Sequence, residues 1–215
     1  MPSAPVEARL GRIVAKLRTA ARGQFQPFGA FGHGFRRRRR LTESQVAAFE
    51  RRHAVKLPPE YRAFVTGVEN GGAGPGYGLF SLAGSVTEEP RGRVPDDFLR
   101  TPFPHRRAYN PHNDRKLASF WRRVENGDVE EDEADRLLQS RVSGTLVLCH
   151  EGCGILHVLV VTGPSRGQVW VDDLCNQQGV WPLGVGFLDW YERWLDSVLA
   201  GGDGVWWQNE SFSGD

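Results

Sequence analysis

The chain has 215 residues, of which 40% are hydrophobic and 11% aromatic, so it can form one α+β domain with a substantial core and extensions. No apolar run approaches the roughly 18 residues of a membrane span, and the N-terminus lacks the apolar centre of a signal peptide. We therefore expect a cytoplasmic protein with no membrane partner. The odd number of cysteines, three, argues against a disulfide framework and fits a reducing compartment.

The formal net charge of +1 conceals a strong asymmetry along the chain. Residues 1–40 hold ten basic residues but one acidic residue, Glu7, whereas residues 41–215 hold 17 basic and 25 acidic residues, a formal charge of −8. Five of the basic residues form the run Arg36 to Arg40. An acidic body is poorly suited to nucleic acid but well suited to a basic protein partner, so we consider nucleic-acid binding unlikely.

The first 82 residues predict three helices and a strand. Residues 6–21 have one apolar face, and a Gly/Phe/Pro linker follows at residues 23–34. Thr42 and Gln45 form a capping box that begins a helix ending near His53. Pro58 and Pro59 begin the next helix, whose apolar stripe reaches Val68 and which residues 70–72 (Asn-Gly-Gly) should end. Residues 77–82 have the pattern of a strand.

The second half predicts helices at the start, an antiparallel sheet, and a closing helix. Residues 83–113 are a long, proline-rich irregular stretch, followed by helices at 114–125 and 129–140, of which the second is strongly acidic. Alternating segments joined by glycine turns predict strands at 145–150, 155–161, 168–172 and 180–183. Residues 187–199 predict a helix with a large aromatic face, after which a tail carries Trp206 and Trp207.

This order of features resembles the SUKH superfamily, named for the yeast Smi/Knr cell-wall regulator. The resemblance lies in LTESQVAAFERRHAVKLPPEYRAFV and ENGGAGPGYGLFSL, in LVLCHEGCGILHVLVVTGPSRGQVWVDD, and in the closing FLDWYERWLDSVL. It implies an α+β fold, an antiparallel sheet flanked by helices, at residues 41–200. Residues 1–40 would then be a basic helical extension and lead-in, and residues 201–215 a tail. The five-arginine run departs from the family's expected mixed loop.

Several residue groups invite a catalytic or metal-binding interpretation. Cys149, His150, Cys153 and His157, with Cys175, are the residue types of a zinc site or a Cys–His nucleophile. No second pair of ligands has the required spacing, however, and strand neighbours such as Cys149 and His150 point to opposite faces. The glycine-rich segment 70–76 lacks the Lys-Ser/Thr of a phosphate loop. The carboxylates Glu43, Glu50, Asp172 and Asp173 have no identifiable perturbing partner. We therefore predict no catalytic residue, metal or cofactor.

The resemblance implies a non-enzymatic protein-binding module. Bacterial members are regarded as immunity proteins that neutralise a cognate toxin, often a nuclease or deaminase, by covering its active cleft. The alternative is an intracellular scaffold or regulator of the Smi/Knr type. We expect a protein partner to be bound by the glycine-rich bend, the 83–113 loop and the acidic helix. The candidate residues are Glu69, Asn70, Tyr77, Asp96, Asp97, Glu130, Glu131, Asp132 and Glu133.

Overall fold

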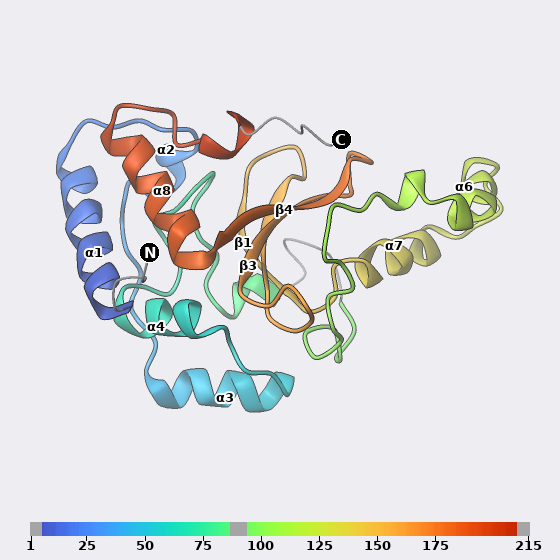
Figure 1. Cartoon of the computed structure of the whole chain (residues 1–215), viewed down its shortest axis with the longest axis horizontal. Helices are drawn as coiled ribbons and strands as arrows, with labels where there is room; N and C mark the ends of the chain where they lie inside the picture. Colours follow the sequence, from blue (N-terminus) through green and yellow to red (C-terminus); the bar gives the residue numbers. More distant parts are fainter. Residues whose placement is uncertain (1–5, 87–93, 210–215) are drawn as a thin grey trace.

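The computed structural model, which describes residues 6–86 and 94–209, has an α+β fold built on a four-stranded antiparallel sheet (Figure 1). The strands run in the spatial order β1-β2-β3-β4, so each pairs with its neighbour in sequence. They are β1 (Thr145–His150), β2 (Leu156–Val160), β3 (Gln168–Asp173) and β4 (Gly179–Gly186). This confirms the predicted antiparallel sheet flanked by helices.

The α-helices form two groups on opposite sides of the sheet (Figure 1). One group lies with the N-terminal half: α1 (Val6–Arg22), α2 (Ala30–His33), α3 (Glu43–His53), α4 (Pro59–Gly67) and, from the C-terminal part, α8 (Phe187–Leu199). The other consists of α6 (Ala118–Glu125) and α7 (Glu131–Ser140), which project from the body. Short 3-10 turns cover 84–86, 111–113, 115–117 and 206–209. None of the helices in the described ranges is long and apolar enough to cross a membrane.

Local chemistry explains where the helices begin. The Thr42 hydroxyl accepts a hydrogen bond from the Gln45 backbone N–H (3.3 Å), and the Gln45 side chain accepts one from the Thr42 N–H (2.9 Å). This reciprocal pair is the predicted capping box, and it satisfies two amides that the first turn of α3 leaves free. Pro59 occupies the first turn of α4, where the missing N–H has no cost.

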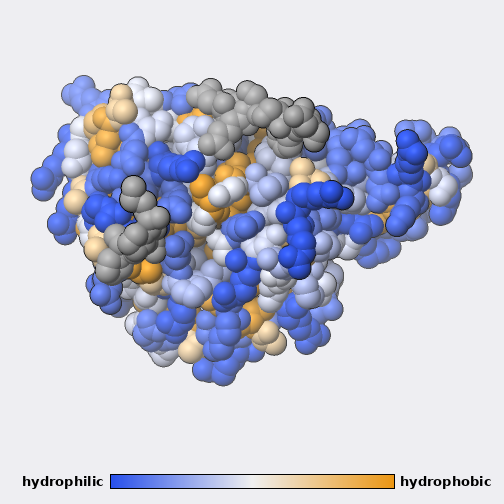
Figure 2. All heavy atoms as spheres, in the orientation of Figure 1, coloured by the Kyte–Doolittle hydropathy of each residue, from blue (hydrophilic) through white to orange (hydrophobic). Residues whose placement is uncertain are grey.

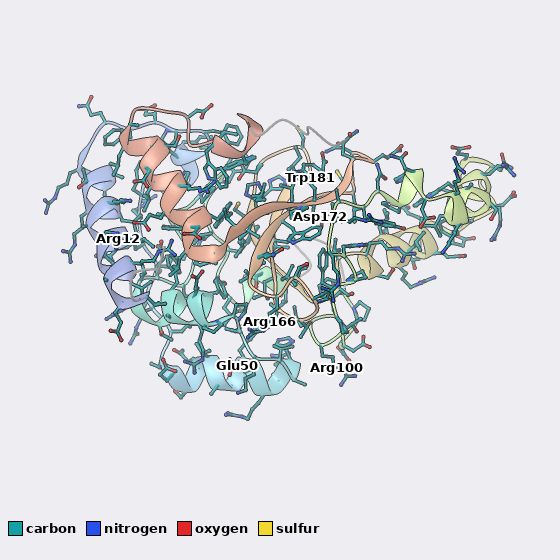
Figure 3. The ribbon with its side chains drawn as sticks, viewed as in Figure 1. Arg12, Glu50, Arg100, Arg166, Asp172 and Trp181 are labelled. Carbon is teal, nitrogen blue, oxygen red and sulfur yellow. The ribbon has the colours of Figure 1, made fainter. Side chains whose placement is uncertain are left out.

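The basic helix α1 packs on α8, where three of its basic side chains form ion pairs. The buried Arg9 forms ion pairs with Asp189 and Glu192, and Lys16 pairs with Glu192 and Asp196. Arg12 lies between the two helices (Figure 3). Beneath this layer, Ile13 and Leu17 are almost fully buried. The N-terminal helix is therefore part of the packed structure.

Two local predictions were wrong, and the tail makes contacts that the sequence did not indicate. Residues 77–82 form no regular strand, because Gly76 and Gly78 take positive φ values of 57° and 99° and interrupt the extension; a single bridge joins Gly72 and Leu79. The second helix ends at Gly67, before the predicted Asn-Gly-Gly stop. The described part of the tail packs back on the body, where Trp207 meets the His157 ring edge-on at 4.4 Å.

Both faces of the sheet are covered. Successive side chains along each strand point to opposite faces, and both sets are buried by a packed layer. His157 faces α8, where Trp190 Nε1 donates a hydrogen bond to its Nδ1 (3.1 Å). On the other face, Trp170 packs edge-on against Phe103 of the long irregular segment. Farther along that second face, Leu156 pairs across the strands with Asp172, and both side chains line a cleft beneath α6 and α7.

Candidate functional site

The large hydrophobic side chains that remain exposed among the described residues gather in one place. Phe28, Phe31 and Tyr77 are 42%, 85% and 41% exposed, respectively. The Phe28 and Phe31 rings lie 5.5 and 5.7 Å from the Tyr77 ring, and His150 stacks on Tyr77 at 5.8 Å. We call these four residues the aromatic patch. Exposed, clustered aromatic rings are typical of the anchoring centre of a protein interface.

Two glycines allow the segments that carry this patch to approach each other. A Cβ added to Gly29 would lie 2.0 Å from the carbonyl oxygen of Gly76, and one added to Gly76 would lie 2.4 Å from that of His150. Both glycines also have positive φ values, 74° and 57°. A side chain at either position would therefore separate the Phe28–Phe31 turn, the Tyr77 bend and the end of β1.

A buried polar network lies beneath the patch. The Cys149 thiol donates a hydrogen bond to Glu151 Oε1 (3.3 Å), and the same oxygen lies 3.7 Å from His157 Nδ1. Burial raises the pKa of Glu151 to about 7 and raises that of Cys149 well above its usual value. Burial also lowers the pKa of His157 to about 3, so the imidazole is neutral.

This network is the one group of metal-ligating side chains among the described residues whose donor atoms converge, all lying within 4.8 Å of one another. The hydrogen bond from Trp190 already occupies the Nδ1 lone pair of His157, the lone pair that a metal beside Glu151 requires. The Cys149 thiol is also held in its protonated form by burial. The donor set therefore suits a hydrogen-bonded core better than an ion.

The sulfur and imidazole groups considered from the sequence lie in different environments. Cys149 is buried, whereas Cys153 and Cys175 are exposed. His150 stacks on Tyr77 at the surface, away from the buried Cys149 thiol. As strand alternation predicts, Cys149 and His150 therefore do not form a nucleophile–base pair.

A cleft of about 550 Å³ opens between the sheet and the projecting helices α6 and α7. Its walls include the apolar side chains of Trp121, Leu138 and Leu156. Three carboxylates also line it: Glu125 from α6, Asp135 from α7 and Asp172 from β3. None of the described lysines or arginines lines this cleft, which we call the acidic cleft. Figure 3 shows Asp172 on the sheet, on the side facing the projecting helices.

Among the described residues that line the cleft, His112 is the one whose side chain could carry a positive charge. It stacks on Trp121 at 4.0 Å, and burial lowers its pKa. The described lining therefore combines three carboxyl groups with an aromatic wall. This combination suits a cationic group, since carboxylates pair with guanidinium or ammonium and aromatic rings attract cations.

The patch and the cleft meet at the turn between β1 and β2. A Cβ added to Gly152 would lie 3.5 Å from the Tyr77 hydroxyl, whereas Gly154, two residues later, lines the cleft. Cys175, from the β3–β4 turn, also lines the cleft, and its thiol donates a hydrogen bond to the Cys153 carbonyl (3.5 Å). The two features therefore form one continuous surface.

The predicted partner-binding residues divide among several places. Tyr77 lies at the centre of the aromatic patch. Glu130, Glu131, Asp132 and Glu133 are exposed at the start of α7, and Asp96 and Asp97 are exposed elsewhere, on the segment beside α3. The Asn70 side chain accepts a hydrogen bond from the Leu82 N–H (2.8 Å) and so holds the glycine bend. Residues 87–93 of the predicted loop lie outside the described residues.

Glu69 requires a correction. Its side chain has no exposed area, and Tyr191 donates a hydrogen bond to its Oε1 (2.8 Å). Burial raises the pKa of Glu69 to about 8. A carboxyl group in this position cannot touch a partner, so its assignment to the partner surface was wrong.

Sequence reasoning missed Phe28, Phe31 and the cleft residues Glu125, Asp135 and Asp172 as parts of one surface. The linker's unusual aromatic content was the available signal for the two phenylalanines, because a purely solvated linker rarely carries so many rings. No comparable signal indicated that α6 and α7 would bring carboxylates over Asp172.

No protein-family model, curated protein or solved structure matches the chain.

Proposed function

We propose that this chain is a non-enzymatic protein-binding module of the SUKH type, an immunity protein that covers the active cleft of a cognate toxin. The observation that supports the proposal most is the continuous surface in which exposed aromatic rings adjoin the acidic cleft. Aromatic anchors supply most of the energy of many interfaces, and complementary charge supplies speed and specificity.

A toxin that acts on nucleic acid must hold a polyanion, so its active cleft carries basic side chains. Those side chains match the exposed Glu125 and Asp135 carboxylates and the exposed acidic start of α7. Figure 2 shows that the visible face of the projecting helices is almost entirely hydrophilic. The partner would therefore be recognised by charge at the helices and by apolar contact at the aromatic patch.

The proposal is tested by producing the chain with the product of the neighbouring open reading frame and measuring growth rescue and binding. We expect Tyr77→Ala to weaken binding about tenfold or more, because it removes the central ring of the patch. Glu125→Gln with Asp135→Asn should weaken it and reduce its salt dependence. Glu7→Gln, on the exposed side of α1, removes a charge far from the cleft and serves as the control.

Rescue that survives both the Tyr77 and the cleft substitutions, in variants that melt like the parent, would contradict the proposed surface. Binding without rescue would favour the scaffold or regulator alternative. Turnover of a small molecule by the purified chain, lost on replacing Cys149 or His157, would contradict the non-enzymatic assignment.

A further inference from the structure

The five-arginine run is held in a fixed, extended conformation along the glycine bend. Arg36 accepts a hydrogen bond from the Ala73 N–H (3.0 Å), and the Arg38 N–H donates to the Gly71 carbonyl (3.2 Å). Arg37 bridges to Gly72, and the Leu41 N–H donates to the Val65 carbonyl (2.9 Å). Main-chain bonds at both ends therefore anchor the run, so the cost of ordering its backbone is already met by the fold.

Four residues of this run line one hollow together with a residue from another element. Arg37, Arg38, Arg39 and Arg40 line a groove of about 460 Å³ together with Arg18 of α1. Val14, Gly67 and Val68 complete the lining, to which no acidic side chain of residues 6–86 and 94–209 contributes. We call this the arginine groove.

The guanidinium groups of the groove form no ion pair with a carboxylate of the described residues, although the charge of Arg37 lowers the pKa of the buried Glu69 against the larger effect of burial. Within residues 6–86 and 94–209, no carboxylate lies within ion-pair distance of the five groove arginines, although the Arg40 side chain donates to the Gly67 carbonyl (3.3 Å). The nearby Glu69 is buried, and burial raises its pKa to about 8, so it holds a proton at neutral pH. Because arginine does not deprotonate in proteins, the groove keeps five positive charges.

We propose that the arginine groove binds an oligophosphate, the chemistry shared by free polyphosphate and the phosphate chain of a nucleotide. Guanidinium forks bind phosphate oxygens in bidentate fashion, and several forks on a fixed backbone suit several linked phosphates. In the part of the chain that the structure describes, no aromatic ring lines the groove, so these residues offer no platform on which nucleic-acid bases could stack. This site lies beside α1 and α4, apart from the aromatic patch and the acidic cleft, and does not depend on the proposed function.

The test is a calorimetric titration of the full chain with tripolyphosphate at neutral pH and about 50 mM salt, repeated at about 200 mM. We expect saturable binding that weakens with salt. Arg38→Ala with Arg40→Ala should weaken it about tenfold or more, since it removes two forks. Arg51→Ala with Arg52→Ala, two exposed arginines of α3 outside the groove, removes the same charge and should change affinity less than about twofold.

Titrations with ATP and with citrate identify the recognised group. Affinity for ATP close to that for tripolyphosphate, with much weaker citrate binding, supports a phosphate-chain site. The proposal is overturned by an absence of saturable tripolyphosphate binding, by equal loss in the two double variants, or by citrate binding as tightly as tripolyphosphate. A circular-dichroism melt of each variant shows whether the fold is retained.

Discussion

At the scale of single residues, two buried carboxyl groups have pKa values shifted in opposite directions. Glu69 is fully buried with the Tyr191 hydroxyl as its main partner, and burial raises its pKa to about 8. Burial also tends to raise the pKa of Glu50, but hydrogen bonds from Lys56 and the Leu57 N–H outweigh it and the pKa falls. Glu69 is therefore neutral in the folded state at pH 7, whereas Glu50 is charged.

The pH dependence of stability should reveal this difference. When the pKa of a carboxyl group is higher in the folded state than in the unfolded state, the free energy of unfolding falls as pH rises between the two pKa values. For Glu69 this range is about 4.5 to 8. We expect Glu69→Gln to remove that loss, so that its free energy of unfolding exceeds the parent's by about 1–3 kcal/mol at pH 8, with the advantage disappearing near pH 5. Urea unfolding of both proteins at several pH values measures this difference in the free energy of unfolding.

Glu50→Gln is the matched control, because it replaces the buried carboxylate with the lowered pKa. Its side chain is 4% exposed in the ion pair with Lys56, and the structure places Arg62 nearby. The stability that a depressed pKa supplies is present above the unfolded pKa and is lost as pH falls through the folded value. This substitution should therefore destabilise the protein at pH 8 and less so in acid. If the free energy of unfolding of the parent and of Glu69→Gln depended on pH in the same way, the prediction would be wrong and Glu69 would be charged in the folded state.

At the scale of elements, α1 should unfold together with the domain. Leu17 is 1% exposed beneath the ion-paired layer, so Leu17→Ala should lower the free energy of unfolding by about 2–4 kcal/mol. Gly11 lies in the same helix with nothing within 4 Å of an added Cβ, so Gly11→Ala should raise it by about 0.5–1 kcal/mol. Chemical unfolding followed by tryptophan fluorescence measures both. Changes smaller than about 0.5 kcal/mol in both variants would mean that α1 frays independently.

The sequence predicted best those elements whose signals are local. The capping box at Thr42 and the proline at position 59 mark helix starts through bonds within one turn, and both occur in the structure. The strand predicted at 77–82 failed because its alternating pattern said nothing of the φ values at Gly76 and Gly78. There the chain instead bonds to β1 at separate points, through the Tyr77 N–H to His150 and the Phe80 N–H to Leu148.

At the scale of the whole molecule, the candidate surface joins parts that are distant in sequence. Tyr77 was predicted as part of the glycine-rich bend, but its contacts with Phe28 and Phe31 depend on how the lead-in folds over that bend. The burial of Glu69 likewise depends on α8, which supplies Tyr191. Such tertiary contacts leave no periodic signal in one sequence, so neither the grouping of the rings nor the burial of Glu69 could be predicted from it.

The packing is also uneven across the molecule. Every residue of β2 is buried, and α8 buries most of its residues, whereas α6 and α7 have no buried residue. The helices that wall the acidic cleft are therefore attached by few buried contacts, as Figure 1 shows in their projection from the body. Regions with little buried apolar surface open at lower free energy than the core.

Native-state hydrogen exchange should therefore separate the projecting helices from the rest. We expect the amides of α6 and α7 to exchange with opening free energies at least about 2 kcal/mol below those of β2 and α8. The α1 amides, covered on the buried face by α8, should follow the core and serve as the internal reference. Exchange of α6 and α7 at the rate of β2 would contradict this. Since a partner that fills the acidic cleft must bridge these helices to the sheet, its binding should slow their exchange more than that of α1.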